Sequence, residues 1–385
     1  MAFGGPSVEH DVSIITAQQV MAVAGERHDV VPIYVATDGR WWTGPSLLEI
    51  GSFATQPPKD AQPVELRLGR AVPLVTPATG RFGKDQELRV DVVINAIHGT
   101  GGEDGALLGA LELARLPHAG RGLAAAAVTM DKHLSKAVLK YAGFDVLPHV
   151  RVERASWEAG EETAVGRIRE ELTGDVVVKP ATLGSSIGVA RCRDDEELSD
   201  ALQLALELDR QVIVEPFAAG ATELNVAVLG RVGEESLVSE VERPIGGEAG
   251  LSFEDKYLSG AKGKGQKGAS GKGGGMATQG RVIPADVPAA WRDRVKAIAV
   301  EAHAALRLSG VVRYDFFVLD DGERFVINEP NTVPGSFAFY LFEPGGLTFD
   351  LLVERLIEIA VAEQQEERST VRAFESALLS RHIGA

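Results

Sequence analysis

Short apolar runs alternate with amphipathic stretches along most of this chain. The alternation favours an α/β fold, in which helices and sheets pack in layers. No apolar run approaches the roughly 18 residues that a membrane-spanning helix requires. The apolar runs predict strands at residues 30–35, 92–97, 176–178, 212–214, 224–229, 311–319 and 324–327.

Three amphipathic stretches carry the signals of helices. Asp131 and Asp194 are of a residue type that caps a helix at its amino end, and Gly143 is of a type that ends one. A third stretch shows helical spacing alone. The apolar positions with this spacing are Leu134, Val138 and Tyr141; Leu198, Leu202 and Ala205; and Trp291, Val295, Ile298, Ala302 and Ala305.

Size and composition limit the class of protein. At roughly 100–200 residues per domain, 385 residues predict two or three domains. The net charge of −16 makes the chain a poor candidate for general nucleic-acid binding. Cys192 is the single cysteine, so no intrachain disulfide can form, which fits a reducing compartment. The amino terminus lacks the basic and apolar regions of a secretory signal, so we expect a cytoplasmic protein without a membrane partner.

Two segments read as connections. Residues 51–89 are rich in Pro, Gly and polar groups, with only scattered apolar pairs. Residues 259–280 are dominated by Gly and Lys and have almost nothing to bury, so this segment cannot offset its own ordering entropy. It is either a disordered linker or a loop that orders over an anionic ligand. Its flanks, Lys256-Tyr257 and Ile283-Pro284, favour the second interpretation, a lid.

A lysine followed by a glycine-and-serine loop comes directly after an apolar strand. The lysine is Lys179, and the loop contains Gly184, Ser185, Ser186 and Gly188. Glycines let a backbone approach a phosphate closely, and serines add hydrogen-bond donors. The order of residues differs from that of a P-loop. Taken alone, such a segment is usually only a turn.

Carboxylates and an amide alternate along two neighbouring predicted strands. Arg313 and Asp315 share a face of the first strand, and Glu329 and Asn331 share a face of the second. If the two faces coincide, Asp315, Glu329 and Asn331 form an all-oxygen site of the kind that Mg²⁺ prefers beside nucleotide phosphates. The alternative is a surface hairpin with solvated charges, which the irregular Pro330 makes less attractive.

Other polar residues lie at strand ends and in glycine turns. Glu215 ends one apolar strand and Glu223 opens the next, where carboxylates can accept hydrogen bonds from an adenosine. Residues 4–13 form a glycine turn leading into a helix, whose amino end attracts anions, while Glu9 could counter a substrate ammonium. His98 opens a second glycine loop after a strand. Each of these loops alone could equally be a connecting turn.

Taken in order, these motifs resemble those of the D-alanine–D-alanine ligase family within the ATP-grasp superfamily. The resemblance runs from residue 4 to about residue 360. The first two motifs are those of the D-alanine ligase-like branch. The matching stretches are GGPSVEHDVS, HGTGGEDG, Met130-Asp131-Lys132, VVVKPATLGSSIGV, NVAVLG, FEDKYLSG, VVRYDFF and INEPNTVPG.

The resemblance implies an α+β ATP-grasp fold of three domains, with the nucleotide between the second and the third. The expected domains are an amino-terminal substrate domain (1–120), a central subdomain (121–214) and a carboxy-terminal metal-binding domain (215–385). It also implies a homodimer that uses ATP and two Mg²⁺ ions, with Mn²⁺ as a possible substitute. The implied roles are ATP binding for Lys132, Lys179, Ser186, Glu215 and Glu223; the start of the lid for Lys256 and Tyr257; metal binding for Asp315, Glu329 and Asn331; substrate binding for Glu9, His98, Tyr340 and Leu341; and catalysis for Glu9, Ser185, Arg313 and the Gly335 amide.

The implied reaction joins two D-alanines for peptidoglycan precursor synthesis. The carboxylate of the first amino acid attacks the γ-phosphorus of ATP, and the amine of the second attacks the resulting acyl phosphate while a closed lid excludes water. One alternative is the same chemistry with another acceptor, such as D-lactate, D-serine or a substrate of secondary metabolism. A second alternative is a non-catalytic nucleotide-binding protein, against which the intact lysines and metal-site residues argue.

Two departures from the family pattern stand out. The ligases usually place a serine that receives the second substrate's carboxylate shortly after the NTVPG motif, and Tyr340 falls at that position here. The acceptor pocket is therefore expected to differ, whereas the donor site is expected to keep D-alanine. In addition, only three residues precede Gly4, so we expect the first strand to be almost absent, through a misassigned start codon or a shortened chain.

Overall fold

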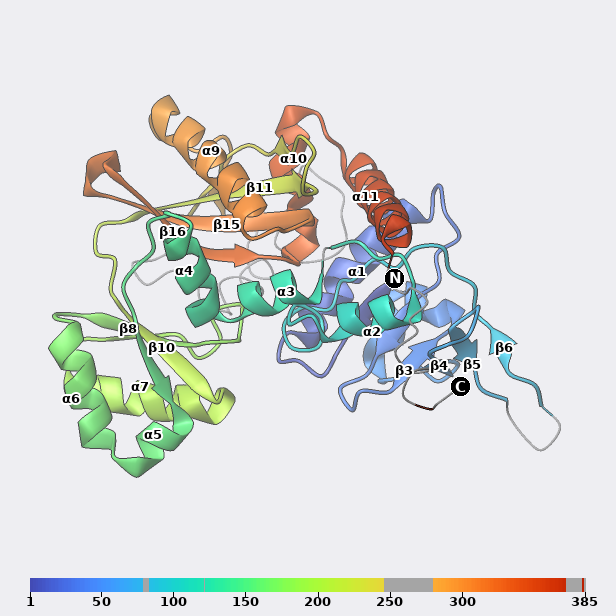
Figure 1. Cartoon of the computed structure of the whole chain (residues 1–385), viewed down its shortest axis with the longest axis horizontal. Coiled ribbons are helices and arrows are strands. Elements are labelled where there is room, and N and C mark those ends of the chain that lie inside the picture. Colours follow the sequence, from blue (N-terminus) through green and yellow to red (C-terminus); the bar gives the residue numbers. More distant parts are fainter. Residues whose placement is uncertain (79–82, 121, 246–279, 372–382, 384–385) are drawn as a thin grey trace.

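The computed structural model describes residues 1–78, 83–120, 122–245, 280–371 and 383. Within these residues the chain builds three mixed layers of sheet and helix, which follow one another from blue to red in Figure 1. The expected lid, with Lys256 and Tyr257, lies outside the described residues.

The amino-terminal layer is a six-stranded sheet with strands in chain order. β1 and β2 are parallel, and the following pairs are antiparallel. Gly4 must be a glycine, because a Cβ there would lie 2.2 Å from the Val35 carbonyl oxygen. The elements are β1 (Ala2–Gly4), α1 (His10–Ala24), β2 (Ile33–Val35), β3 (Trp41–Thr43), β4 (Gln62–Leu66), β5 (Leu74–Thr76), β6 (Gln86–Glu87) and α2 (Ala106–Ala114), with short 3₁₀ helices at Pro45–Leu48 and Ile50–Ala54.

The central layer is an antiparallel sheet in the order β7-β10-β8-β9, with helices against its face. Apolar residues of the strands and of α7 form one buried cluster, which includes Cys192. The elements are β7 (Val150–Glu153), α5 (Arg154–Ala159), α6 (Glu161–Glu171), β8 (Val176–Pro180), β9 (Ala190–Cys192), α7 (Asp195–Leu208) and β10 (Gln211–Pro216). α3 (Leu123–Met130) and α4 (Lys132–Tyr141) precede them in the chain but pack on β16 (Arg324–Asn331) of the carboxy-terminal sheet.

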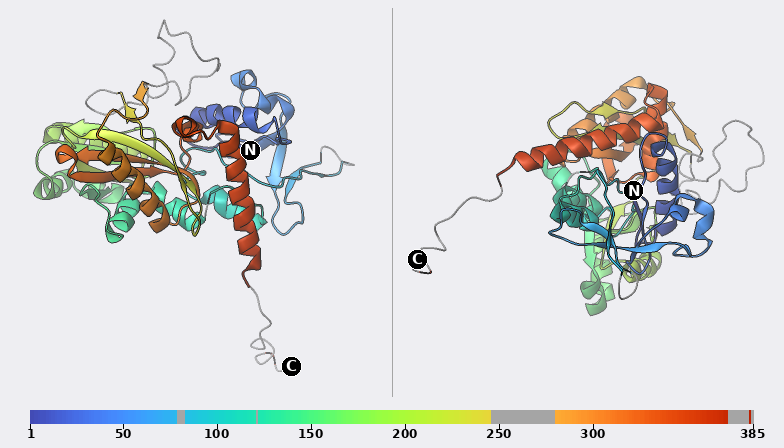
Figure 2. Two further views of the ribbon diagram at one scale, coloured as in Figure 1. Left: turned by 90° about the horizontal axis from the view of Figure 1, so that it is seen from above. Right: turned by 90° about the vertical axis from the view of Figure 1, so that its right-hand side faces the viewer.

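The carboxy-terminal layer is an antiparallel sheet in the order β12-β11-β15-β16, beside a two-stranded ribbon of β13 and β14. α9 covers this sheet, and α11 packs on α1 of the first layer (Figures 1 and 2). The elements are β11 (Thr222–Gly230), β12 (Leu237–Val238), β13 (Arg243–Pro244), β14 (Arg281–Val282), α9 (Ala289–Ala305), β15 (Gly310–Leu319), β16 (Arg324–Asn331), α10 (Phe339–Phe342) and α11 (Phe349–Ser369), with 3₁₀ turns at Asp320–Gly322, Gly335–Ala338 and Glu343–Gly345.

The two aspartates predicted to cap helices do so. Asp131 accepts a hydrogen bond from the Leu134 N–H and Asp194 accepts one from the Glu197 N–H. The apolar spacing found α4 but not its buried face, because Tyr141 is 94% exposed. The residues of α4 that are buried are Ser135, Lys136 and Leu139.

Two expectations were wrong in part. Residues 51–89 are not a mere connection, since they contain β4, β5 and β6. β4 buries Val64 alone, β5 is buried but only three residues long, and β6 is exposed, so their apolar signal is short and weak. Residues 92–97 are mostly buried but form only isolated bridges, from Asn95 to Ala2 and from Val93 to His118. The three-residue β1 offers too little backbone for a longer ladder.

None of the described helices is both long and apolar enough to cross a membrane. The largest apolar cluster joins residues of α1 and β2 with residues of β15, α10 and α11. The amino-terminal and carboxy-terminal layers therefore share one hydrophobic core.

Candidate active site

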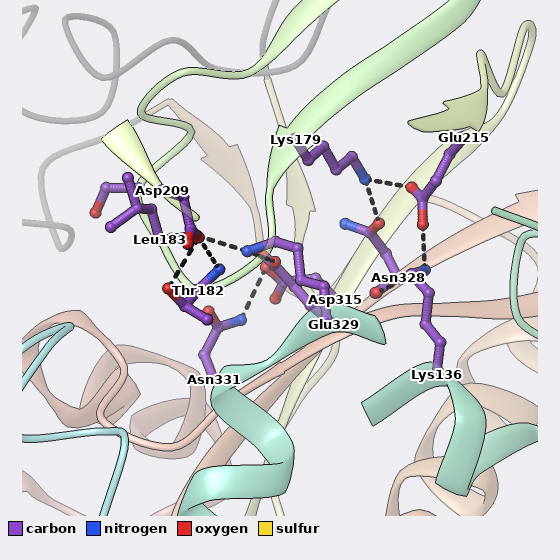
Figure 3. Close-up of polar contacts among 12 residues, drawn as sticks. Lys136, Lys179, Thr182, Leu183, Asp209, Glu215, Asp315, Asn328, Glu329 and Asn331 are labelled. Carbon is purple, nitrogen blue, oxygen red and sulfur yellow. Dashed lines mark hydrogen bonds and ion pairs between the residues drawn. The ribbon is translucent and has the colours of Figure 1, made fainter. Parts of the chain in front are cut away.

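A buried carboxylate holds two lysines together (Figure 3). Glu215 on β10 lies 2.7 Å from the Nζ of Lys136 and 2.7 Å from the Nζ of Lys179. Burial alone would raise the pKa of Glu215, but the two lysines outweigh it and lower the pKa to about 2. Glu215 therefore stays ionised and fixes two ammonium groups side by side, which is suited to binding an anion such as a phosphate chain.

Asn328 completes this group through an irregularity in β16. Asp315 pairs with Glu329 while Phe316 pairs with Ile327, so Asn328 is left out of the ladder as a bulge. Its side-chain oxygen accepts from Lys179 Nζ at 3.0 Å and its carbonyl accepts from Lys136 Nζ at 3.2 Å. Neither Lys136 nor Asn328 stands out as a site residue in the sequence. The i, i+4 spacing of Lys132 and Lys136 on one helix was the signal available for the lysine.

The predicted oxygen-rich face exists. The register pairs Arg313 with Asn331 and Asp315 with Glu329, so the two predicted faces coincide. Arg313 Nε and Nη2 donate to the two carboxylate oxygens of Asp315 at 2.6 and 2.7 Å, and Asn331 Nδ2 donates to Asp315 at 3.1 Å. Glu329 lies 3.7 Å from Lys132 Nζ, which also donates to the Leu183 carbonyl at 2.5 Å.

The oxygen atoms of Asp315, Glu329 and Asn331 are ligands of the type that a hard cation binds. Two carboxylates and one amide oxygen are what Mg²⁺ selects, with phosphate oxygens and waters completing its shell. Among the described residues no cluster of three or more His, Cys, Asp or Glu side chains exists, so a metal here would depend on the Asn331 amide and on its substrate. The site faces a pocket whose lining includes Glu103, Lys132, Leu183, Gly184, Glu329 and Asn331.

The glycine-serine loop meets the start of α1 at Glu9. Ser185 Oγ donates to the buried carboxylate of Glu9. Both Ser185 and Ser186 have positive φ, 52° and 59°, so the loop is tightly turned. A Cβ on Gly184 would lie 3.0 Å from both Glu9 carboxylate oxygens, and glycine there allows the loop to close on Glu9. The structure thus brings together two residues that are 176 positions apart.

Glu103 links the two loops that flank Glu9. Its carboxylate accepts from the Gly99 N–H at 2.8 Å, from the Val333 N–H at 3.0 Å and from the Thr332 hydroxyl at 3.3 Å. Burial, followed by the charge of Glu9, raises the pKa of Glu103 to about 7. Glu103 lies in the HGTGGEDG motif, but its role does not show in the sequence, because its partners in the NTVPG motif are about 230 residues away.

His98 and the turn after Gly335 are joined by Thr16. Thr16 Oγ1 lies 3.1 Å from His98 Nε2 and accepts from the Ser336 N–H at 3.3 Å. Burial, with a further effect of Arg313, lowers the pKa of His98 to about 4, so the imidazole is neutral near pH 7. Ser336 and the two residues after it all have φ between 50° and 54°. Such conformations cost energy and persist where the surroundings impose them.

The remaining predicted site residues, Tyr340, Leu341 and Glu223, differ in how far they are buried. Tyr340 is buried and the guanidinium carbon of Arg281 lies 3.9 Å from its ring centre. Leu341 is fully buried in the core, and its carbonyl accepts from the Glu240 N–H. Its side chain therefore does not line the site. Glu223 is the second residue of β11, close to the strand start that was expected there, and is half-buried.

Two protein-family models match this chain, and together they span most of the site residues described above. The family model of the D-ala D-ala ligase N-terminus matches residues 1–121, and that of the D-ala D-ala ligase C-terminus matches residues 138–358. The chain is 33% identical to the D-alanine--D-alanine ligase of Geobacillus thermodenitrificans (97% of this chain, 98% of the relative) and 34% identical to that of Chlorobium phaeovibrioides (96% and 98%).

Solved structures of similar chains agree with the fold. The D-alanine-D-alanine ligase from Coxiella burnetii superposes with a TM-score of 0.76 at 25% identity, over 95% of this chain and 96% of that one. The VanG D-Ala:D-Ser ligase from Enterococcus faecalis gives a TM-score of 0.74 at 29% identity, over 93% and 98%.

Proposed function

The chain belongs to the D-alanine–D-alanine ligase family, and we infer that it is an ATP-dependent ligase that joins two D-alanines for peptidoglycan precursor synthesis. The ATP-grasp fold expected from the sequence is that of its structural neighbours. The observation that carries the inference is one pocket bordered by Lys132, Glu329 and the glycine-serine loop, with the lysine–glutamate group beside it.

The residues divide the reaction between two sides of this pocket. Lys132, Lys136 and Lys179 offer positive charge to the phosphates of ATP, and the glycine-serine loop adds donors. Asp315, Glu329 and Asn331 would hold Mg²⁺, which supplies further charge to the phosphates when bound. Glu9 receives the ammonium group of the first D-alanine, so that its carboxylate is directed at the γ-phosphorus.

The second step needs a site for negative charge on the attacked carbonyl oxygen. Asp315 takes one donor each from Nε and Nη2 of Arg313, so the two Nη1 donors and the second Nη2 donor are available to the reacting group. The Gly335 amide lies at the start of the tightly turned segment that Thr16 supports. Fixed donors of this kind stabilise the tetrahedral intermediate at no cost of reorganisation.

The test is phosphate release from ATP against a panel of D- and L-amino acids, with products identified by mass. We expect ADP, phosphate and D-alanyl-D-alanine with D-alanine alone. A mixed product formed only when a second amino or hydroxy acid is present would favour the alternative, a ligase with another acceptor. The tyrosine at position 340 and the D-Ala:D-Ser ligase among the structural neighbours support that alternative.

The metal assignment has its own test. Replacing Glu329 by Gln should abolish most turnover and weaken the Mg²⁺ dependence of nucleotide binding, because a neutral amide replaces a charged ligand. The thermal midpoint should remain close to the parent's, since Glu329 is only partly buried. Near-normal turnover at saturating Mg²⁺ would contradict the assignment.

We also propose the three domains given above, a cytoplasmic location and a homodimer. Family membership supports all three, and the single cysteine is consistent with a reducing compartment. Analytical ultracentrifugation of the purified chain tests the dimer, and a monomer at micromolar concentration would contradict it. Limited proteolysis with and without ATP tests the lid over residues 259–280.

A further inference from the structure

A row of polar side chains extends the metal-site face across the whole carboxy-terminal sheet. Glu242 pairs with Asn225, Asn225 pairs with Asp315, and Asp315 pairs with Glu329. Residues opposite each other in a ladder direct their side chains to the same face. Glu242, Asn225 and Asp315 are all buried, and Asn225 Nδ2 donates to Glu242 at 3.0 Å. The outer end of this row has no part in the mechanism described so far.

Arg281 occupies that outer end. Its Nη1 donates to Glu242 Oε2 at 2.7 Å, and its side chain is only 10% exposed. The guanidinium lies over the ring of Tyr340, with its carbon 3.9 Å from the ring centre. A guanidinium is a planar fork of five N–H donors, so an arginine held by one carboxylate can still donate to a second one.

Tyr340 connects Arg281 to the reacting centre. Burial and Glu242 raise the pKa of Tyr340, and both Arg281 and Arg313 act in the opposite direction. The Tyr340 hydroxyl is therefore within the field of both guanidinium groups. Arg313, the group assigned to the attacked carbonyl, is held by Asp315, and Arg281 is held by Glu242 at the other end of the same row of buried side chains. Both guanidinium groups are therefore held on one face of the sheet.

The acceptor brings a negative charge into this part of the site. In an amino acid the carboxyl carbon is separated from the nucleophilic nitrogen by a single carbon, a separation of about 2.5 Å from standard bond lengths. The carboxylate must therefore come close to the reacting carbonyl, where an uncompensated charge is costly in a buried pocket. Among the described residues around Tyr340, Arg281 is the cation that has no role in the phosphate or oxyanion chemistry.

We propose that Arg281, stacked on Tyr340 and oriented by Glu242, binds the carboxylate of the acceptor and selects acceptors with a carboxylate next to the nucleophile. Amines without an acid group next to the nucleophile are thereby excluded as acceptors. This inference rests on the proposed ligase function. The competing explanation is that the Arg281–Glu242 pair only fastens β14 to the sheet.

A competition experiment separates the two explanations. The enzyme, with ATP and Mg²⁺, receives D-alanine and D-alanine amide together, and the two dipeptide products are quantified by mass. The amide lacks a carboxylate and so acts only as an acceptor. The product ratio reports the relative kcat/KM of the two acceptors and does not depend on how much of the enzyme is folded.

We expect Arg281→Gln to lower the preference for D-alanine over its amide by about 10–100-fold, the size of one charge-assisted hydrogen bond. Arg281→Lys, which keeps the charge but not the fork, should lower it less and carries the test if the Gln variant makes no product. The matched control is Arg243→Gln, on the other strand of the same ribbon, where Arg243 pairs with the exposed Asp286. Its product ratio should equal the parent's.

The outcomes are distinct. An unchanged ratio in both Arg281 variants would overturn the inference and leave the pair with a structural role. Equal shifts in the Arg281 and Arg243 variants would also overturn it, because they would trace the effect to the ribbon. If the parent forms neither product, the ligase function itself is wrong and the inference falls with it.

Discussion

At the scale of single residues, burial and the charges nearby together decide which groups are ionised. Glu215 is kept ionised by two lysines, whereas burial leaves His98 and His303 neutral at pH 7. His303 lies on α9 away from the pocket, and its Nδ1 is 3.3 Å from the Tyr314 hydroxyl. Burial lowers its pKa from 6.5 to about 4. A group of this kind links folding to pH without affecting the reaction.

We predict that His303 makes the protein less stable in mild acid. Between pH 6.5 and 4 the unfolded chain binds a proton that the folded chain does not. The unfolding free energy therefore decreases as the pH is lowered through this window, by up to about 3 kcal/mol for this group. His303→Gln should flatten the dependence of the unfolding free energy on pH there. Denaturant unfolding at several pH values measures it, and parallel curves for parent and variant would contradict the assignment.

At the scale of elements, α4 and α7 begin in the same way but serve different purposes. Each starts with an aspartate cap, with acceptor distances of 3.0 Å at Asp131 and 2.8 Å at Asp194. α4 carries Lys132 and Lys136 to the phosphate side of the pocket, whereas α7 only covers the central sheet. Variants of the two capping aspartates can therefore separate an effect on helix stability from an effect on ATP binding.

Removing each cap should destabilise the fold, but only one of the two caps should affect binding. Asp194→Ala is expected to lower the unfolding free energy by about 1 kcal/mol, and Asp131→Ala by more, because the Asp131 carboxylate also accepts from Gln211 Nε2 at 2.6 Å. Only Asp131→Ala should raise the KM for ATP, because fraying of the first turn of α4 displaces Lys132. Thermal unfolding and steady-state kinetics of the two variants provide the comparison. A raised KM in both would mean that general loosening, and not the position of Lys132, is responsible.

At the scale of the whole molecule, Glu103 ties the amino-terminal layer to the carboxy-terminal one beside the reacting centre. It is a positioning residue, because it acts through the Gly99 and Val333 amides. Its pKa of about 7 lies above the usual value of 4.5, so its contribution to stability falls as pH rises from 4.5 to 7. The residue thus opposes the effect of the buried histidines.

We predict that Glu103→Gln lowers kcat by about 10-fold, the equivalent of one lost hydrogen bond in the transition state, with little change in the KM for ATP. The variant should also lose any step in the pH–rate profile near pH 7. Thr332→Val, which removes only the 3.3 Å hydroxyl contact, should have a smaller effect. An unchanged profile together with a raised KM for ATP would show a general structural role instead.

Local patterns were enough to predict much of the fold and of the site. The caps at Asp131 and Asp194 and the strands around Lys179 and Glu215 follow from spacing along the chain and are confirmed. Spacing left open whether the faces of Asp315 and Glu329 coincide, and the strand register decides that they do. The roles of the site residues stay predictions. The strands within residues 51–89 escaped notice because each offers only one to three buried residues, too few for a period to show in the sequence.

The sequence by itself determined the α/β layers, the fold family and the residue types that gather at the site, because these depend on periodicity and on motifs that are continuous in the chain. Only the tertiary structure decided that Lys136 shares Glu215 with Lys179, that Asn328 bulges toward both lysines, and that Arg281 lies on Tyr340. These contacts join segments that are far apart in the chain. A buried charge finds its partner in space, and that partner is fixed by how those segments pack.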